Sequence, residues 1–261
     1  MIDYQPGGGN EAHHVYRTEG DDPIERKTEI RDLGIIMNNE ATFTDHITAS
    51  AKKGRKLAGW ALRTFQSREK SLMLTLLKVL IRPHLEYGCQ VWNPHLAQEI
   101  SLLECAQRDF TRKIEGTTEM DYWERLRELN LYSLQRRRER YIIIYIWKII
   151  YGLVPNFEGE DKIRVYDSGR LGLLCSRPRL TGGRRTRFGT RKENSLVVFG
   201  QKLFNHIPKE IRACPGPLET FKRELDRFLR TVPDQPVLHG GEYPQQATSN
   251  SIIAQAGLMS R

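Results

Sequence analysis

The chain has 261 residues, of which 39% are hydrophobic and 28% charged, a composition typical of a folded globular protein and not of a disordered one. Its formal net charge is +9 at pH 7, which indicates a polyanionic partner. The four cysteines form no Cys-x-x-Cys pair, which argues against a zinc ribbon and a disulfide framework.

The first forty residues are predicted to form strands and turns. Segments 13–18 and 24–29 predict a hairpin, and 32–37 predicts a short apolar strand followed by two asparagines. Asp21 and Asp22 lie in the turn between the first two segments, where a pair of carboxylates has the composition of a polymerase metal site. Glu19 and Gly20 precede them and Pro23 follows, with Arg17 and Arg26 nearby, so a solvated turn is the favoured interpretation.

The rest of the chain is mostly helical by its hydrophobic period, apart from residues 156–192. Thr44 or Asp45, Thr118 and Ser133 are candidate N-caps, and Pro83 is expected to end or kink the second helix. The expected helices cover 45–65, 68–81, 97–114, 118–130, 134–151, 195–206 and 218–230. After residue 232 the composition predicts a loose tail.

No targeting or membrane segment is expected. The N-terminus lacks the cationic start and apolar run of a signal peptide. The most apolar stretch, 141–154, is about 14 residues long, whereas a bilayer span needs about 20. We therefore expect a buried core helix there and an intracellular protein, with no sorting signal to distinguish nucleus from cytoplasm.

The excess positive charge is concentrated between residues 162 and 192. This segment has ten basic residues and one acidic residue, so the remainder of the chain is neutral. Arginine forks bind phosphate in a bidentate manner, and Phe188 offers a stacking face. The predicted nucleic-acid contacts here are Arg177, Arg179, Arg184, Arg185, Arg187, Phe188 and Arg191. Six neutralised phosphates would give a salt slope of about −4 to −5. The alternative is a linker that is merely soluble.

A second basic surface is predicted on the helix at 45–65. Lys52, Lys56 and Arg63 share one face at about 100° per residue, with Lys53 beside them. Trp60 flanks this face, as does Phe65 at the end of the helix, and either ring can cover a sugar or base. The alternative is an ordinary solvated helix face. A further run of arginines at 136–140 is expected to fan out into solvent from one end of the apolar helix.

No catalytic, metal or cofactor site is predicted. The sequence contains no Walker A motif and no Gly-x-Ser-x-Gly motif. His84, Cys89 and His95 are spaced unlike any common zinc site. Glu158, Glu160 and Asp161 lie in a segment without apolar strands to orient them, so these residues give no basis for an active site or for a small-molecule substrate.

Several segments together resemble the reverse transcriptase of jockey-like non-LTR retrotransposons. They include Leu-Ile-Arg-Pro-His-Leu-Glu-Tyr at 80–87 with Val-Trp-Asn-Pro at 91–94, and Leu-Glu-Cys-Ala-Gln-Arg-Asp-Phe-Thr at 103–111. The resemblance also includes Asp-Leu-Gly-Ile-Ile at 32–36, the Arg-Lys-Leu-Ala-Gly helix at 55–59, and residues 125–134, 204–212 and 221–226. It covers about residues 13 to 230.

The resemblance implies a mostly α fold with a small N-terminal β element, followed by a thumb-like helical bundle and a further helical region. The implied divisions are palm or primer-grip strands at 1–40, thumb-like helices at 41–92, a helical connection at 93–155, a basic linker at 156–195, a helical segment at 196–231 and a disordered tail at 232–261. The family's metal-binding aspartates lie upstream of these segments. We therefore expect no polymerase activity from this chain alone, but sequence-independent binding of RNA or an RNA/DNA duplex, with the oligomeric state open.

Two other interpretations remain at this point. The chain is part of a working RNA-directed DNA polymerase if an upstream palm belongs to the same gene. It is instead a helical protein-interaction module if it has no affinity for nucleic acid. The upstream reading frame separates the first from the others.

Overall fold

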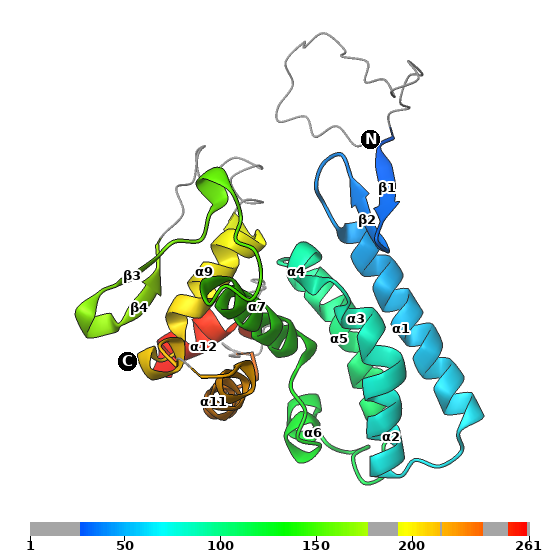
Figure 1. Ribbon diagram of the computed structural model, residues 1–261. Coiled ribbons are helices and arrows are strands. Elements are labelled where there is room, and N and C mark those ends of the chain that lie inside the picture. The colour runs from blue at the N-terminus through cyan, green and yellow to red at the C-terminus, as the bar shows by residue number, and fades with distance from the viewer. Residues whose placement is uncertain (1–26, 177–192, 215, 237–249, 260–261) are drawn as a thin grey trace.

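The structure is a computed structural model that describes residues 27–176, 193–214, 216–236 and 250–259. Helices account for 61% of it and strands for 7%, with a two-stranded antiparallel sheet ahead of the helices, as the sequence predicts. The helices form two lobes with separate hydrophobic cores, and Figure 1 shows these lobes side by side.

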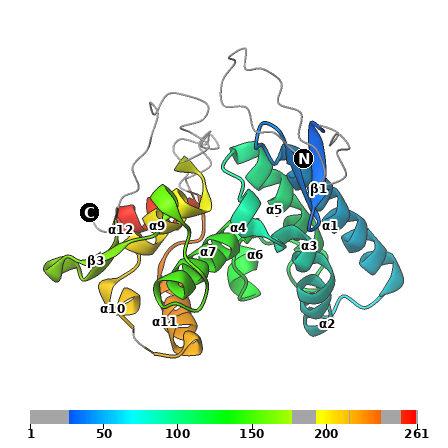
Figure 2. The same ribbon diagram turned by 45° about the horizontal axis from the view of Figure 1, so that its top comes forward.

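The first lobe is a helical bundle that carries the N-terminal hairpin at one end (Figure 2). Its elements are β1 (Glu29–Asp32), β2 (Ile35–Asn38), α1 (Thr44–Thr64), α2 (Lys70–Leu76), the π-helix η1 (Leu77–Ile81), α3 (Arg82–Glu86), α4 (Cys89–Trp92), α5 (Ala97–Thr111) and α6 (Tyr122–Glu128). Helix α1 packs mainly against α5 and α3.

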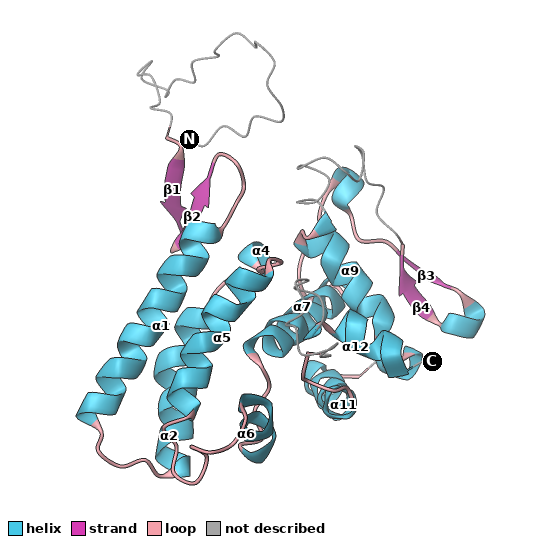
Figure 3. Ribbon diagram, turned by 180° about the vertical axis from the view of Figure 1, so that it is seen from behind, coloured by secondary structure: helices cyan, strands magenta, loops and turns pink. Residues whose placement is uncertain are grey.

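The second lobe is built around α7 and α9, which lie against each other (Figure 3). Its elements are α7 (Leu134–Ile150), the 3-10 turns η2 (Gly159–Asp161) and η3 (Gly169–Leu171), β3 (Val165–Asp167), β4 (Leu173–Cys175), α9 (Leu196–His206), α10 (Lys209–Arg212), α11 (Leu218–Thr231) and α12 (Ile252–Met259). The antiparallel β3–β4 hairpin contacts α9 and α10 through β4.

The N-terminal hairpin differs from the single strand predicted at 32–37. Strand β1 pairs with β2 so that Asp32 lies opposite Ile35, and the chain reverses at Leu33 and Gly34. Both turn residues have positive φ, 45° and 87°, which is the conformation of the tight turns whose twist matches that of the strands. A hydrophobicity pattern does not reveal this turn, because Leu33 is apolar and reads as part of a buried strand. In the structure Leu33 is 81% exposed.

Of the two outcomes expected at Pro83, an end of the second helix or a kink, the structure excludes the first. The chain stays helical from Lys70 to Glu86, but the turn before the proline widens into the π-helix η1. A proline ring removes one backbone donor and crowds the carbonyl four residues earlier, and a π-bulge relieves both problems. The predicted cap at Thr118 is also wrong, because Asp121 caps α6 by accepting from the Trp123 N–H at 3.0 Å.

Helix α7 begins where the sequence predicts. The Ser133 hydroxyl accepts a hydrogen bond from the Arg136 N–H at 3.0 Å, which satisfies one free donor of the first turn. Leu134 belongs to the first core, whereas the buried residues from Ile142 onward belong to the second. One helix therefore joins both lobes.

The arginine run at the start of α7 does not fan out into solvent, so that prediction is wrong. Arg136 and Arg138 are both 0% exposed. Arg137 forms an ion pair with Glu86 at 2.5 Å, and Arg140 pairs with Asp226 at the same distance. The run lies at the junction of the lobes, where acceptors from α3 and α11 surround it.

The segment predicted as a loose tail includes described structure. Helix α12 packs on α9, and Ile252 is fully buried in the second core. Its N-terminus is held by the Glu139 carboxylate, which accepts from the Ile252 N–H at 2.7 Å. A carboxyl side chain from α7 therefore fixes a helix more than a hundred residues later.

Candidate nucleic-acid interface

The basic stripe of α1, defined here as Lys52, Lys56 and Arg63, lies on the solvent side of the first lobe. All three residues are exposed. They fall within about 40° of one another around the helix axis, opposite the buried stripe that includes Ile47, Ala58 and other core residues. The three positions span about 16 Å along the axis, which equals about five phosphate steps of one strand.

Packing orients the neighbours of this stripe. The Arg55 guanidinium donates to the Leu102 carbonyl of α5 at 3.3 Å, so it is turned away from the stripe. Burial, and then the positive charge of Lys53, lowers the pKa of His84 on α3. A Cβ at Gly59 would lie 3.3 Å from the Arg63 guanidinium, so the missing side chain gives that guanidinium room along the helix.

The two aromatic residues predicted to flank the stripe lie together at its end. Trp60 is 45% exposed, and its ring meets that of Phe65 edge to face with centroids 6.2 Å apart. Arg68 donates to the carbonyls of Leu62 and Phe65, which satisfies the last turn of α1. An exposed indole beside three cations is a surface that can meet a sugar or base as well as phosphates.

The second predicted set lies outside the described residues: Arg177, Arg179, Arg184, Arg185, Arg187, Phe188 and Arg191. The segment that contains them connects β4 to the start of α9, both in the second lobe. Helix α1 belongs to the other lobe (Figure 1). The two elements that flank this segment in the chain therefore belong to a different lobe from α1.

A buried polar network that the sequence did not indicate joins α5, α6 and α7. The Tyr122 hydroxyl donates to Glu104, and Gln107 donates to the Tyr122 oxygen at 3.1 Å. Both Glu104 oxygens accept from the Leu134 N–H at 3.1 Å, and Arg82 donates twice to Gln107. Burial raises the pKa of Glu104 and of Tyr122. Glu104, Gln107 and Tyr122 are at most 5% exposed, so the network holds helices together and does not face a substrate.

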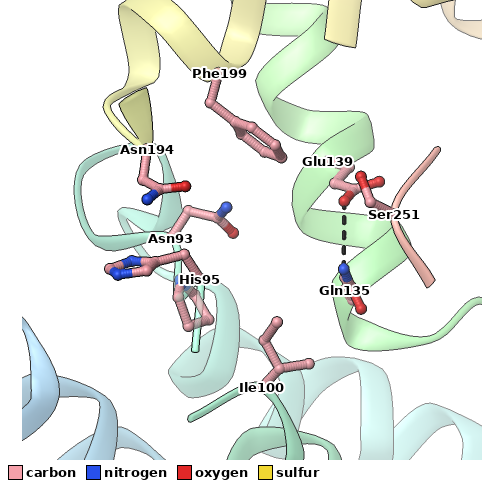
Figure 4. Close-up of a pocket in the computed structure, with 9 residues that line it drawn as sticks. Asn93, His95, Ile100, Gln135, Glu139, Asn194, Phe199 and Ser251 are labelled. Atoms are coloured by element: carbon pink, nitrogen blue, oxygen red, sulfur yellow. Dashed lines mark hydrogen bonds between the residues drawn. The ribbon is translucent and has the colours of Figure 1, made fainter. Parts of the chain in front are cut away.

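A hollow between the lobes contains a second set of polar side chains (Figure 4). Asn93 and His95 face Gln135, Glu139 and Ser251 across it. Burial raises the pKa of Glu139, whose carboxyl group already accepts hydrogen bonds from the Ile252 N–H and from the Gln135 amide at 3.5 Å. The Glu139 carboxyl group is thus used to hold the start of α12. The polar side chains around the hollow are therefore explained by the packing of α12 and do not require a ligand.

Within the described ranges, no group of three or more His, Cys, Asp or Glu side chains is placed to hold a metal ion. In the same part of the chain, no helix has the length and apolar character needed to cross a bilayer.

Comparisons with known proteins relate part of the chain to a mobile element. A probable RNA-directed DNA polymerase from transposon X-element of Drosophila melanogaster is 28% identical over 97 residues, which cover 36% of this chain and 11% of that protein. An uncharacterized protein of Caenorhabditis elegans is 30% identical over 112 residues, or 42% of this chain and 57% of the worm protein. The chain thus contains a region related to a transposon reverse transcriptase, and it matches only part of the length of either relative. No family model and no solved structure matches the chain.

Proposed function

We propose that this chain is the region that follows the catalytic palm in a jockey-like reverse transcriptase, and that it binds RNA or an RNA/DNA duplex through the phosphates. The observation that carries this proposal is the basic stripe of α1, with Trp60 exposed at its end, in a chain partly related to a transposon polymerase. Contacts of this kind position a duplex without reading its sequence.

The N-terminal hairpin supports the placement after a palm. Among the described residues, β1 and β2 pair only with each other. Leu33 at the turn is 81% exposed, and Tyr87, whose hydroxyl donates to the Leu33 carbonyl at 3.0 Å, is 60% exposed. An isolated hairpin is marginally stable in water, so strands of this kind are typical of the edge of a larger sheet.

The test is the salt dependence of duplex binding. A labelled RNA/DNA hybrid is titrated with the wild-type protein and with a triple variant, Lys52→Gln, Lys56→Gln and Arg63→Gln, at several salt concentrations. Each lost phosphate contact lowers the slope of log K against log salt by about 0.9, so the triple variant is expected to lose about 2.7.

A matched control removes the same charge elsewhere. Lys113→Gln, Arg127→Gln and Lys209→Gln alter three exposed cations that lie off α1. This control is expected to keep the wild-type slope. Equal slopes for the two triple variants would show that only the net charge matters, and no binding at low salt would remove duplex binding as the function.

A further inference from the structure

A groove of about 470 Å³ lies between α4, α7 and α11, on elements other than α1. Its volume is within the range of about 300–1,000 Å³ that is usual for ligand pockets. Helix α7 contributes Tyr141, Tyr145 and Lys148, which lie on successive turns of one side, and α11 contributes Lys222. The groove therefore combines aromatic rings with cations.

The cations of this groove are not all neutralised. Arg140 forms two hydrogen bonds with Asp226, at 2.5 and 2.7 Å, so its charge is compensated. Lys222 pairs with Glu219 at 2.6 Å, but the Glu219 side chain is 80% exposed, and exposed pairs are weak. Lys148 has no acidic partner within 4 Å in the described part of the chain. An anion entering the groove meets one free ammonium group and one that is weakly held.

The aromatic side of the groove is held in place before any ligand arrives. The Arg137 guanidinium donates to the Tyr141 hydroxyl at 2.6 Å and lies 5.4 Å from the centre of its ring. Tyr145 packs against the second core and lines the same groove. Rings fixed in this way lose little conformational freedom when a planar group stacks on them.

We propose that this groove binds one nucleotide unit, with its base against the ring of Tyr145 and its phosphate at Lys148 and Lys222. Base stacking on an aromatic ring contributes without regard to base identity, and the ammonium groups supply the charge that a phosphate needs. The unit belongs either to a free nucleotide or to a single strand. The site goes beyond the proposed duplex contacts of α1 because it serves an unpaired nucleotide on different elements.

The test measures binding of two probes to the full chain, AMP and a labelled 12-nucleotide single-stranded RNA. Tyr145→Ala is expected to weaken binding about tenfold, whereas Tyr145→Phe, which keeps the ring, retains it. Lys148→Gln is expected to weaken binding of the strand and to lower its salt slope by about 0.7. Tyr166→Ala removes a tyrosine that is 49% exposed on β3 and serves as the matched control.

The outcomes separate the two sources of the nucleotide. Weaker binding of both probes supports a site for which a free nucleotide suffices, and weaker binding of the strand alone supports one that needs adjacent phosphates. Unchanged binding of both probes by Tyr145→Ala and Lys148→Gln, with helical circular dichroism retained, overturns the proposal. If Tyr145→Ala does not fold, Lys148→Gln decides, and unchanged binding of both probes by that variant alone overturns the proposal. Duplex binding by the α1 variants is scored separately, so failure of one proposal is not failure of the other.

Discussion

Replacing Arg138 with Met should leave the free energy of unfolding unchanged or raise it by about 1–4 kcal/mol, whereas replacing Arg136 with Met should lower it by about 3–5 kcal/mol. Both side chains are 0% exposed. Arg136 donates to the carbonyls of Val232 at 3.3 Å and Pro233 at 2.7 Å, so its loss leaves two acceptors without donors. All three guanidinium nitrogens of Arg138 lack an acceptor among the described residues, so its burial is poorly compensated.

Glu104 gives this comparison a pH dependence. Burial raises its pKa above 4.5, while hydrogen bonding from Tyr122 and the charge of Arg138 act in the opposite direction. The folded state therefore holds this proton more tightly than the unfolded state, and stability falls as the pH rises above about 4.5, by at most about 1.4 kcal/mol per pH unit. Met at position 138 removes one of the opposing effects, so the loss extends to higher pH.

Urea denaturation followed by tryptophan fluorescence at pH 5 and pH 8 measures these differences. The advantage of Arg138→Met should be largest at pH 5, where the Glu104 carboxyl is closest to neutral, and should shrink toward pH 8. A loss of more than about 2 kcal/mol at pH 5 for Arg138→Met would contradict the reasoning, because it would mean that the buried guanidinium is well solvated by acceptors.

Two further predictions concern the first lobe, one on glycine substitutions in α1 and one on amide protection of the N-terminal hairpin. Gly54→Ala should lower the free energy of unfolding by about 1–3 kcal/mol, because the new Cβ would lie 2.6 Å from a Leu85 methyl, whereas Gly59→Ala, which meets only the mobile end of Arg63, should raise it by up to about 1 kcal/mol. Thermal melting of the two variants measures both changes, and equal effects would contradict the close approach of α1 to α3. In hydrogen exchange, the amides of residues 29–38 should be much less protected than those of α5 and α7, because the hairpin has no third strand among the described residues. Protection of the hairpin amides equal to that of the α7 amides would contradict this prediction.

Local signals in the sequence were sufficient for most helices. Ser133 was predicted to cap α7, and its hydroxyl does accept from the first turn. The period of apolar residues placed α1 at 45–65, and the helix runs from Thr44 to Thr64. These features depend on residues three or four apart, which is the range over which a sequence pattern carries information.

The features that no local sequence pattern indicates depend on partners far apart in the chain. The burial of Arg136 rests on the carbonyls of Val232 and Pro233, almost a hundred residues later. Arg140 is held by Asp226 of α11. A run of four arginines that contains only one acid, Glu139, looks solvated when only its neighbours in sequence are considered. The groove between α4, α7 and α11 was missed for the same reason, because its lining extends from Gln90 to Lys222.

The shared helix α7 has a consequence for how this polypeptide can be divided. Its first turn fills the core of the first lobe and its later turns fill that of the second, so the lobes are not independent modules. A recombinant piece that ends before residue 134 loses Leu134 from the bundle, and one that starts after residue 150 lacks the central wall of its own interior. Expression of the first lobe in isolation would have to keep the first turn of α7, and expression of the second would have to keep the later turns, so each piece needs part of the same helix.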